Sequence, residues 1–259
     1  MGRLGEYLCH RPLLHQVALL PVAYTLGLDF KAQRGPVLIN SLVLPPPSNG
    51  RLTATSSFRV NLNDGRRFNL TLPRFHDVGE RVPYKRTYEF AQHVESLGFH
   101  GGFVGHHSFT PETKDPASPF VLLSAIAAQT ERLRLGTGVF LGALHHPIAS
   151  HEQASTLDQI SGGRLMLGVG TGYRDYEFSN FGVNMKPRGR RLNETIELWK
   201  KAWTTGSWEW DGEFFHFSDV PVYPPAVQEP HPPIYIGGNS DAAIDRAAKY
   251  GVMWFSLPM

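Results

Sequence analysis

The sequence predicts an α/β fold with a parallel sheet, and two observations lead to this prediction. Between Gly101 and Gly172, three short apolar runs alternate with two segments of helical pattern. Each of these runs ends at a cluster of Gly, His or Thr. Strands that alternate with helices at this spacing form βαβ units and lie parallel in one sheet. The carboxyl ends of such strands carry the chemistry of the fold, so these clusters mark the expected site.

The composition is that of a globular enzyme. Hydrophobic residues make up 41% and charged residues 19% of the 259 residues, which argues against disorder. The net charge is only +2 and the basic residues are scattered, so we expect no nucleic-acid partner. No apolar run approaches the roughly 18 residues of a membrane span, and we recognise no signal peptide. The single cysteine excludes an internal disulfide framework, and a cytoplasmic protein is expected.

The first 57 residues differ in pattern from the remainder of the chain. Three consecutive prolines at 45–47 interrupt them, and the apolar pieces before these prolines show no sustained period. We interpret residues 1–57 as an N-terminal extension and residues 58–259 as the main domain. The alternative is that the extension holds two real strands, near Val17–Tyr24 and Val37–Leu44.

The main domain is expected to contribute six strands to the sheet. Asp64-Gly65 is a hairpin signal between Phe58–Leu62 and Arg66–Leu72, and the second arm becomes the first sheet strand. The six strands are expected at Phe68–Leu72, Gly102–Gly105, Leu133–Phe140, Leu165–Val169, Ile234–Gly237 and Val252–Ser256. Helical periodicity with proline and glycine end signals predicts helices at Lys85–Leu97, Pro119–Thr130, Pro147–Ser161, Arg190–Trp203 and Ser240–Tyr250.

The pattern changes after the fourth strand. Tyr173–Arg188 is expected to be a long loop, and Ser207–Phe217 a hairpin across Asp211-Gly212. We interpret residues 173–217 as an insertion that serves as a lid or substrate wall. Together these elements predict a TIM (β/α)8-type barrel that is incomplete, with about six of its eight strands. Truncation is the simpler explanation, and missing strands supplied by the N-terminal extension are the alternative.

Two histidine clusters are candidates for chemistry. His106 and His107 follow the second strand, and adjacent residues of an extended chain point to opposite sides, so the pair is poorly placed to bind one metal. One of them can face the barrel opening and titrate near neutrality, and a structural histidine is the alternative. His145, His146, His151 and Glu152 form the second cluster, in which His146 and His151 are five residues apart rather than the four that suit two ligands on a helix. We therefore expect no metal site, and a metallohydrolase is the weaker hypothesis.

Three glycine-rich strand ends are candidates for binding a cofactor. Gly136-Thr137-Gly138 lets a flat group approach the backbone, or else forms a bulge. Gly168–Tyr173 contains a G-x-G pattern, but no acidic residue about twenty positions later completes a dinucleotide motif. Gly237–Ser240 leads into a helix, where free N–H groups and the helix dipole favour a phosphate. An ordinary N-cap at Ser240 is the alternative.

In combination, these segments resemble the bacterial luciferase-like flavin-dependent oxidoreductases over residues 69–258. The residues that carry the resemblance are GHH at 105–107, RLRLGTGV at 132–139, HPIASHEQASTLDQISGGRLMLGVGTGY at 146–173, FGV at 181–183, RGRRLNE at 188–194 and PPIYIGGNS at 232–240. Their order and spacing are specific to the family, whereas they say little about the substrate.

The resemblance implies a barrel that binds FMN or the deazaflavin F420 at the carboxyl ends of its strands. His106 matches the catalytic first histidine of a Glu-His-His triplet, with Gly105 in place of the glutamate. A non-prolyl cis peptide bond against the flavin ring is implied at Gly138–Val139. An arginine that helps to hold the flavin phosphate in luciferase is Thr171 here. The cofactor-binding residues are expected to be Thr137, Gly138, Val139, Gly170, Thr171, Tyr173, Gly238, Asn239 and Ser240.

The leading hypothesis is therefore an FMN-dependent monooxygenase that oxidises a small organic substrate with O2 through a peroxyflavin. NAD(P)H or a separate flavin reductase would supply the electrons, and a homodimer is the assembly that relatives often form. The first alternative is F420-dependent hydride transfer on the same barrel. The second is a non-catalytic flavin-binding or partner subunit, which Gly105 favours.

Overall fold

The computed structural model describes residues 15–18, 69–72, 82–109, 116 and 118–256. The predicted hairpin turn at Asp64-Gly65 and the alternative strand at Val37–Leu44 lie outside these residues, as does the expected domain boundary after residue 57. Within the described part of the chain, none of the helices has the length and apolar character needed to cross a membrane.

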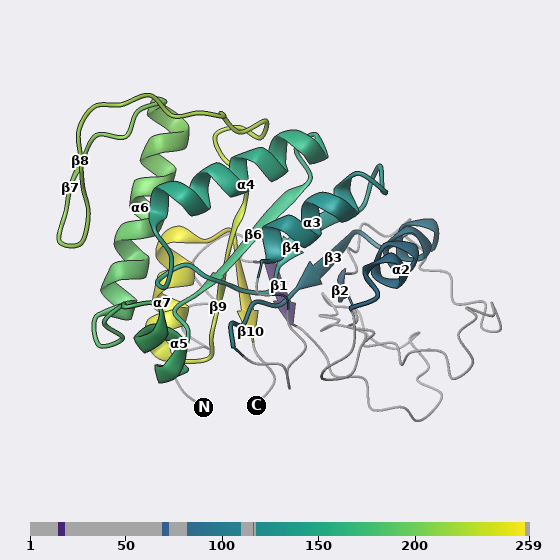
Figure 1. Ribbon diagram of the computed structural model, residues 1–259, viewed down its shortest axis with the longest axis horizontal. Coiled ribbons are helices and arrows are strands. Elements are labelled where there is room, and N and C mark those ends of the chain that lie inside the picture. Colours follow the sequence, from purple (N-terminus) through teal and green to yellow (C-terminus); the bar gives the residue numbers. More distant parts are fainter. Residues whose placement is uncertain (1–14, 19–68, 73–81, 110–115, 117, 257–259) are drawn as a thin grey trace.

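Parallel strands form a curled, incomplete barrel (Figure 1). The order of the sheet is β1-β10-β9-β6-β4-β3-β2, and β5 also pairs with β6. These strands are β1 (His15–Ala18), β2 (Asn69–Thr71), β3 (Gly101–Val104), β4 (Arg134–Thr137), β5 (Phe140–Leu141), β6 (Leu165–Gly170), β9 (Ile234–Gly237) and β10 (Met253–Ser256). Each of the six predicted strand segments contains a described strand, so the α/β class and the incomplete barrel are confirmed.

Helices pack along the outer side of the curled sheet (Figure 1). They are α2 (Tyr84–Ser96), α3 (Pro119–Ala127), α4 (Pro147–Ser161), α5 (Asp175–Asn180), α6 (Arg188–Thr205) and α7 (Asp241–Tyr250). Proline occupies the first position of α3 and α4, where its missing N–H costs no hydrogen bond. Gly162 ends α4 with a positive φ of 63°, a conformation that glycine adopts without a steric penalty.

Two segments differ from the prediction. The strand expected at Leu133–Phe140 is divided into β4 and β5 around the Gly138–Val139 peptide bond, which is cis as the resemblance implies. The loop expected at Tyr173–Arg188 contains the short helix α5. Its polar composition hid the helix, because only Phe178 and Glu177 of α5 are buried.

The strand β1 lies within the segment that we expect to be an extension. It pairs in parallel with β10, beside the last of the six predicted strands. Its overlap with the alternative strand at Val17–Tyr24 consists of Val17 and Ala18. A strand from outside the predicted main domain therefore extends the sheet.

Large side chains fill the inside of the curl. Phe103 on β3, Met166 on β6, Tyr235 on β9 and Phe255 on β10 form one buried cluster, the inner layer. The rings of Phe103 and Phe255 meet edge to face at 4.9 Å between centroids, although three strands separate them in the sheet. Gly136 makes room for this contact, because a Cβ at that position would lie 2.1 Å from Phe103 Cε1.

Charged side chains stabilise the amino ends of the strands through hydrogen bonds to the backbone. The Arg164 guanidinium donates hydrogen bonds to the carbonyl oxygens of Ala127, Thr130 and Leu133, each at 2.9 Å. It thereby satisfies carbonyl groups at the end of α3, which have no partner within the helix. The Glu95 carboxylate accepts hydrogen bonds from the backbone N–H groups of residues 131–133. The amino end is thus built for stability, as is usual in such barrels.

The inner layer gives a direct test of packing. We expect Gly136→Ala to lower the free energy of unfolding by about 1–3 kcal/mol, because the added methyl group overfills a close-packed core. Urea denaturation of the 259-residue chain would measure the change. In a Phe103→Leu background the same substitution should cost clearly less, and an equal cost in both backgrounds would contradict the proposed clash.

Candidate functional site

The carboxyl ends of β3, β4, β6 and β9 meet along one edge of the curled sheet. Val104 pairs with Thr137 across β3 and β4, and Val169 pairs with Ile236 across β6 and β9. We call the residues beyond these strand ends the mouth; they comprise residues 105–109, 138–139, 171–173 and 238–240. The predicted site residues lie in the mouth or in the last two positions of the strands that lead to it.

Val139 lies over a floor made of glycine. A Cβ at Gly170 of β6 would lie 2.7 Å from Val139 Cγ2, and a Cβ at Gly237 of β9 would lie 2.6 Å from Val139 Cγ1. The side chain therefore reaches down onto two neighbouring strands and packs against the inner layer. This packing fixes the cis Gly138–Val139 peptide at the centre of the mouth. A planar group could lie against that peptide without meeting a side chain from Gly138, Gly170 or Gly237.

Thr137 is fully buried and holds two strands together. Its hydroxyl donates a 2.6 Å hydrogen bond to the carbonyl oxygen of Gly168, across β4 and β6. A Cβ at Gly168 would lie 1.9 Å from the Thr137 carbonyl oxygen, so the close approach requires glycine. The Thr137 hydroxyl is thus engaged inside the sheet, directly below the Gly138–Val139 peptide.

The segment after β9 has the features of an anion site. Gly238 has a φ of 129°, and its carbonyl oxygen accepts a 2.6 Å hydrogen bond from Trp254 Nε1. This conformation leads Asn239 and Ser240 to the N-terminus of α7, where both are exposed. The Ser240 hydroxyl accepts a hydrogen bond from Ala243 N at 3.3 Å, so it acts as the N-cap. Asp241 in the first turn already contributes a negative charge there.

His106 is buried in an aromatic stack. It is 2% exposed, and its ring lies parallel to Phe140 and His145, with centroids about 5 Å apart. Its Nδ1 accepts a 3.2 Å hydrogen bond from the backbone N–H of Leu141 on β5. Because Leu141 pairs with Gly170, this hydrogen bond places His106 beside the glycine floor.

His107 lies on the other side of the chain, as expected for adjacent residues. Its Nδ1 is 3.2 Å from Glu177 Oε1, and its ring meets Tyr173 edge to face at 5.6 Å between centroids. Glu177 comes from α5 and is fully buried, and its carboxylate also accepts a 2.7 Å hydrogen bond from Ser108 N. Tyr173 itself is largely exposed, and its hydroxyl accepts a hydrogen bond from Arg174 Nε.

Burial keeps His145 neutral. Its ring stacks on Phe140 and meets Phe181 edge to face at 5.3 Å, and burial lowers the pKa of His145 to about 4. Loss of solvation disfavours the imidazolium form in such surroundings. His145 therefore forms an apolar wall of the mouth at neutral pH.

Of the second predicted histidine cluster, His145 borders the mouth, whereas His146 and His151 do not. His151 is fully buried in α4 between Trp203 and Trp208, and burial lowers the pKa of His151 to about 3. His146 is exposed and contacts the rings of Phe215 and Phe217. Within the described ranges, no three His, Cys, Asp or Glu side chains are placed to hold a metal ion.

The insertion divides into two parts with different neighbours. Residues 173–181 contact the mouth through Tyr173, Glu177 and Phe181. The hairpin of β7 (Trp210–Asp211) and β8 (His216–Phe217) instead lies at the outer side of α6, away from the sheet (Figure 1). The Glu194 carboxylate of α6 holds this hairpin by accepting hydrogen bonds from the backbone N–H groups of Phe214 and Phe215.

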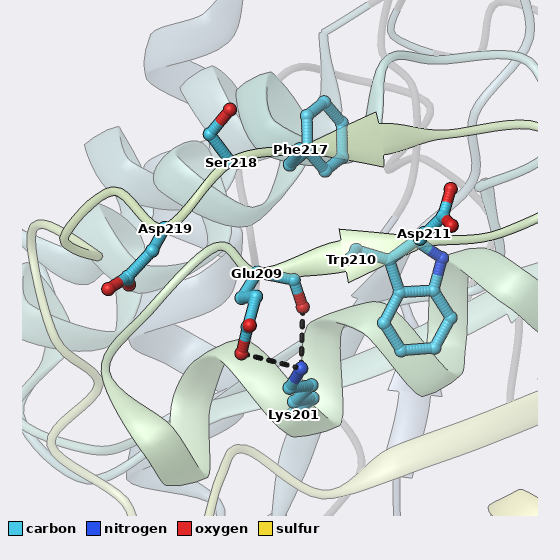
Figure 2. A pocket seen from close by; sticks show the side chains of 7 residues that line it. All are labelled: Lys201, Glu209, Trp210, Asp211, Phe217, Ser218 and Asp219. Atoms are coloured by element: carbon cyan, nitrogen blue, oxygen red, sulfur yellow. Dashed lines mark hydrogen bonds and ion pairs between the residues drawn. The ribbon is translucent and has the colours of Figure 1, made fainter.

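An open hollow lies between α6 and this hairpin. Figure 2 shows Lys201 Nζ bridging two oxygens of Glu209, its carbonyl at 2.6 Å and its carboxylate at 3.6 Å. Asp211 and Asp219 also line the hollow. Lys201 is thus paired with Glu209, which lies just before β7. The hollow lies apart from the strand ends that form the mouth.

The sequence pattern of the family described as luciferase-like monooxygenase matches residues 67–259. The chain belongs to this family. Among its relatives is the oxygenase component of the flavin-dependent trigonelline monooxygenase of Acinetobacter baylyi, 31% identical over 170 residues. That match covers 65% of this chain and 47% of the relative, so the chain spans about half the length of that curated relative.

Solved structures of luciferase-like proteins share the fold. The monooxygenase RslO1 from Streptomyces bottropensis matches 71% of this chain and 57% of its own, with 30% identity and a TM-score of 0.64. Two others are 19% identical and show the fold alone. The FMN complex of the oxygenating constituent of 3,6-diketocamphane monooxygenase from Pseudomonas putida covers 67% and 51% of the two chains, TM-score 0.58. The F420-dependent tetrahydromethanopterin reductase of Methanopyrus kandleri covers 73% and 55%, TM-score 0.60.

Sequence reasoning did not assign three side chains to the candidate site. Glu177, His145 and Phe181 all border the mouth, and none was among the predicted site residues. Phe178 and Phe181 are three residues apart, a spacing that fits a helix, but no pattern singles out Glu177 as a site residue. His145 carries no comparable pattern, since only the turn after β5 brings it to His106.

The buried state of His145 predicts a pH dependence of stability. The pKa of His145 is depressed on folding, so its contribution to stability is complete above the ordinary range near 6.5 and is lost as the pH falls towards 4. Between pH 7 and pH 5, the wild type should lose about 1–2 kcal/mol more of its free energy of unfolding than His145→Phe does. Urea denaturation of both proteins at each pH measures this difference, and parallel losses would contradict the assignment.

Proposed function

We propose that this chain is the FMN-binding part of a flavin-dependent monooxygenase that oxidises a small organic substrate with O2. The observation that carries the proposal is the Val139 peptide, held over Gly170 and Gly237 at the centre of the mouth. Membership of the luciferase-like family supports it, as do the flavin-dependent relative from Acinetobacter baylyi and the FMN complex with the same fold.

The residues present fit a flavin. The Gly138–Val139 peptide is planar and could lie against a planar ring, and the N-terminus of α7 offers N–H groups to a phosphate. Thr137, Gly138, Val139 and Gly170 would border the ring, and Gly238, Asn239 and Ser240 would face the phosphate. Thr171 and Tyr173 would complete the rim. When bound, the cofactor supplies the electrons and the site of reaction with O2.

The side chains of the mouth would donate protons and exclude water. His106 accepts a hydrogen bond from Leu141 N at Nδ1, so its neutral ring carries the proton on Nε2. We propose that this proton serves the oxidation step, as the family match of His106 implies. Residues 173–181, rather than the distant hairpin, would act as the lid that excludes water, because they contact the mouth directly.

The electrons would come from a separate flavin reductase that uses NAD(P)H. The relative from Acinetobacter baylyi is named as an oxygenase component, which supports a two-component system. F420-dependent hydride transfer is the second candidate, because a reductase that depends on F420 has the same fold. A non-catalytic flavin-binding subunit is the third candidate, and it would bind FMN without accelerating its chemistry.

Equilibrium titration of the 259-residue chain with FMN and, separately, with F420 tests the proposal. We expect saturable quenching or enhancement of FMN fluorescence, and no saturable change with F420. Gly170→Ala should weaken FMN binding, because the added Cβ would displace Val139 from its floor. Saturation with F420 alone would establish the alternative cofactor, and a folded chain that binds neither would contradict the proposal.

His106 is tested by the rate at which O2 reoxidises bound, reduced FMN. We expect His106→Ala to change this rate by about 10²-fold, the usual contribution of a positioned acid or base. His216→Ala is the matched control, because His216 is exposed on the hairpin and pairs with Asp211. If both variants bind FMN and reoxidise it at the wild-type rate, His106 has no part in the chemistry.

A further inference from the structure

We propose that Glu177 fixes the tautomer of His107, so that His106 and His107 carry their protons on different ring nitrogens. His106 would act as the proton donor through Nε2–H, and His107 as the proton acceptor through a bare Nε2. Glu177 is a positioning residue in this arrangement, because it acts through His107. The catalytic meaning of the pair rests on the proposed function, whereas its tautomers are a property of the protein alone.

The backbone and a carboxylate impose the two tautomers. At His106, Nδ1 faces the N–H of Leu141 at 3.2 Å, and a nitrogen that accepts a hydrogen bond carries no proton. At His107, Nδ1 faces Glu177 Oε1 at 3.2 Å and Oε2 at 3.4 Å. An ionised carboxylate only accepts hydrogen bonds, so Nδ1 of a neutral His107 must carry the proton. The proton is therefore on Nε2 of His106 and on Nδ1 of His107.

The surroundings of Glu177 fix its carboxylate in position beside His107. Its side chain is fully buried, and a buried charge is tolerated only with hydrogen-bond partners. Ser108 N donates to its Oε1 at 2.7 Å, which fixes the carboxylate beside the residue after His107. The neighbouring Phe178 is also buried and anchors α5 in the core, so the carboxylate cannot swing away with the surface of the helix.

His107 can exchange protons with solvent, whereas His106 is enclosed. The His107 side chain is 16% exposed, and its Nε2 lies on the side of the ring opposite to Glu177. The exposed ring of Tyr173 meets it edge to face and borders the mouth. In the proposed oxidation, His107 Nε2 would take up a proton while Nδ1–H stays bonded to Glu177.

Glutamine at position 177 offers a sharp test. Its amide has a single oxygen. With that oxygen in the position of Oε1, where Ser108 N donates, the oxygen lies 3.2 Å from His107 Nδ1 and the NH2 group takes the position of Oε2, 3.4 Å from the same nitrogen. A donor at this place favours the other tautomer, with the proton of His107 on Nε2. Glu177→Asp keeps the carboxylate and should retain the original tautomer in part. Glu213→Gln is the matched control, because Glu213 forms an exposed ion pair with Arg190.

The readout is the long-range proton–nitrogen NMR spectrum of the chain with labelled histidine at pH 8, where neutral imidazole predominates. Signals of His106 and His107 are assigned by their loss in His106→Gln and His107→Gln. We expect the Nε2–H form for His106 and the Nδ1–H form for His107. Glu177→Gln should move His107 alone towards Nε2–H, and Glu213→Gln should move neither.

A wild-type His107 in the Nε2–H form would overturn the proposal, and this result needs no variant to fold. An unchanged His107 spectrum in folded Glu177→Leu, which removes both acceptor oxygens beside Nδ1, would overturn it as well. The reaction of reduced FMN with O2 should slow by about 10²-fold in Glu177→Gln and not in Glu213→Gln. A chain with both expected tautomers that fails to bind FMN would refute the proposed function and leave the tautomer assignment intact.

Discussion

The contact between Phe103 and Phe255 is the constraint on which the rest of the structure depends. It joins β3 to β10 across the inside of the sheet, and three intervening strands must curl to allow it. A curled parallel sheet directs the carboxyl ends of its strands towards one another, whereas a flat sheet spreads them along a line. The convergence of β3, β4, β6 and β9 at the mouth is thus a consequence of packing inside the curl.

The two ends of the sheet differ in the residues that form them. At the amino end, the charged groups of Arg164 and Glu95 form hydrogen bonds to backbone carbonyl and N–H groups of the turns. At the carboxyl end, glycines lie under Val139, and the polar groups of His107, Asn239 and Ser240 remain at the surface of the mouth. This division allows the same sheet to be stable at one end and chemically versatile at the other.

Patterns that repeat along the chain were readable from the sequence, and contacts across the fold were not. The apolar runs at Leu165–Val169 and Ile234–Gly237 predicted β6 and β9 almost to the residue, because strand periodicity is local. The division of Leu133–Phe140 at a cis bond followed only from the family resemblance. The helix α5 was missed because its buried residues, Glu177 and Phe178, face partners that come from the end of β3 and the core. The expected strand ends do converge. The Glu177 carboxylate beside them could not be predicted from the sequence pattern.

The opposite surroundings of His106 and His107 show how the fold differentiates two identical neighbours. The strand places them on opposite sides, and the curl then supplies a backbone N–H to one and a buried carboxylate to the other. A crystal structure of the chain with FMN tests the central claim most directly. We expect the flavin ring against the Gly138–Val139 peptide and the phosphate at Asn239 and Ser240. A flavin that binds elsewhere, for example in the hollow beside the β7–β8 hairpin, would contradict this account.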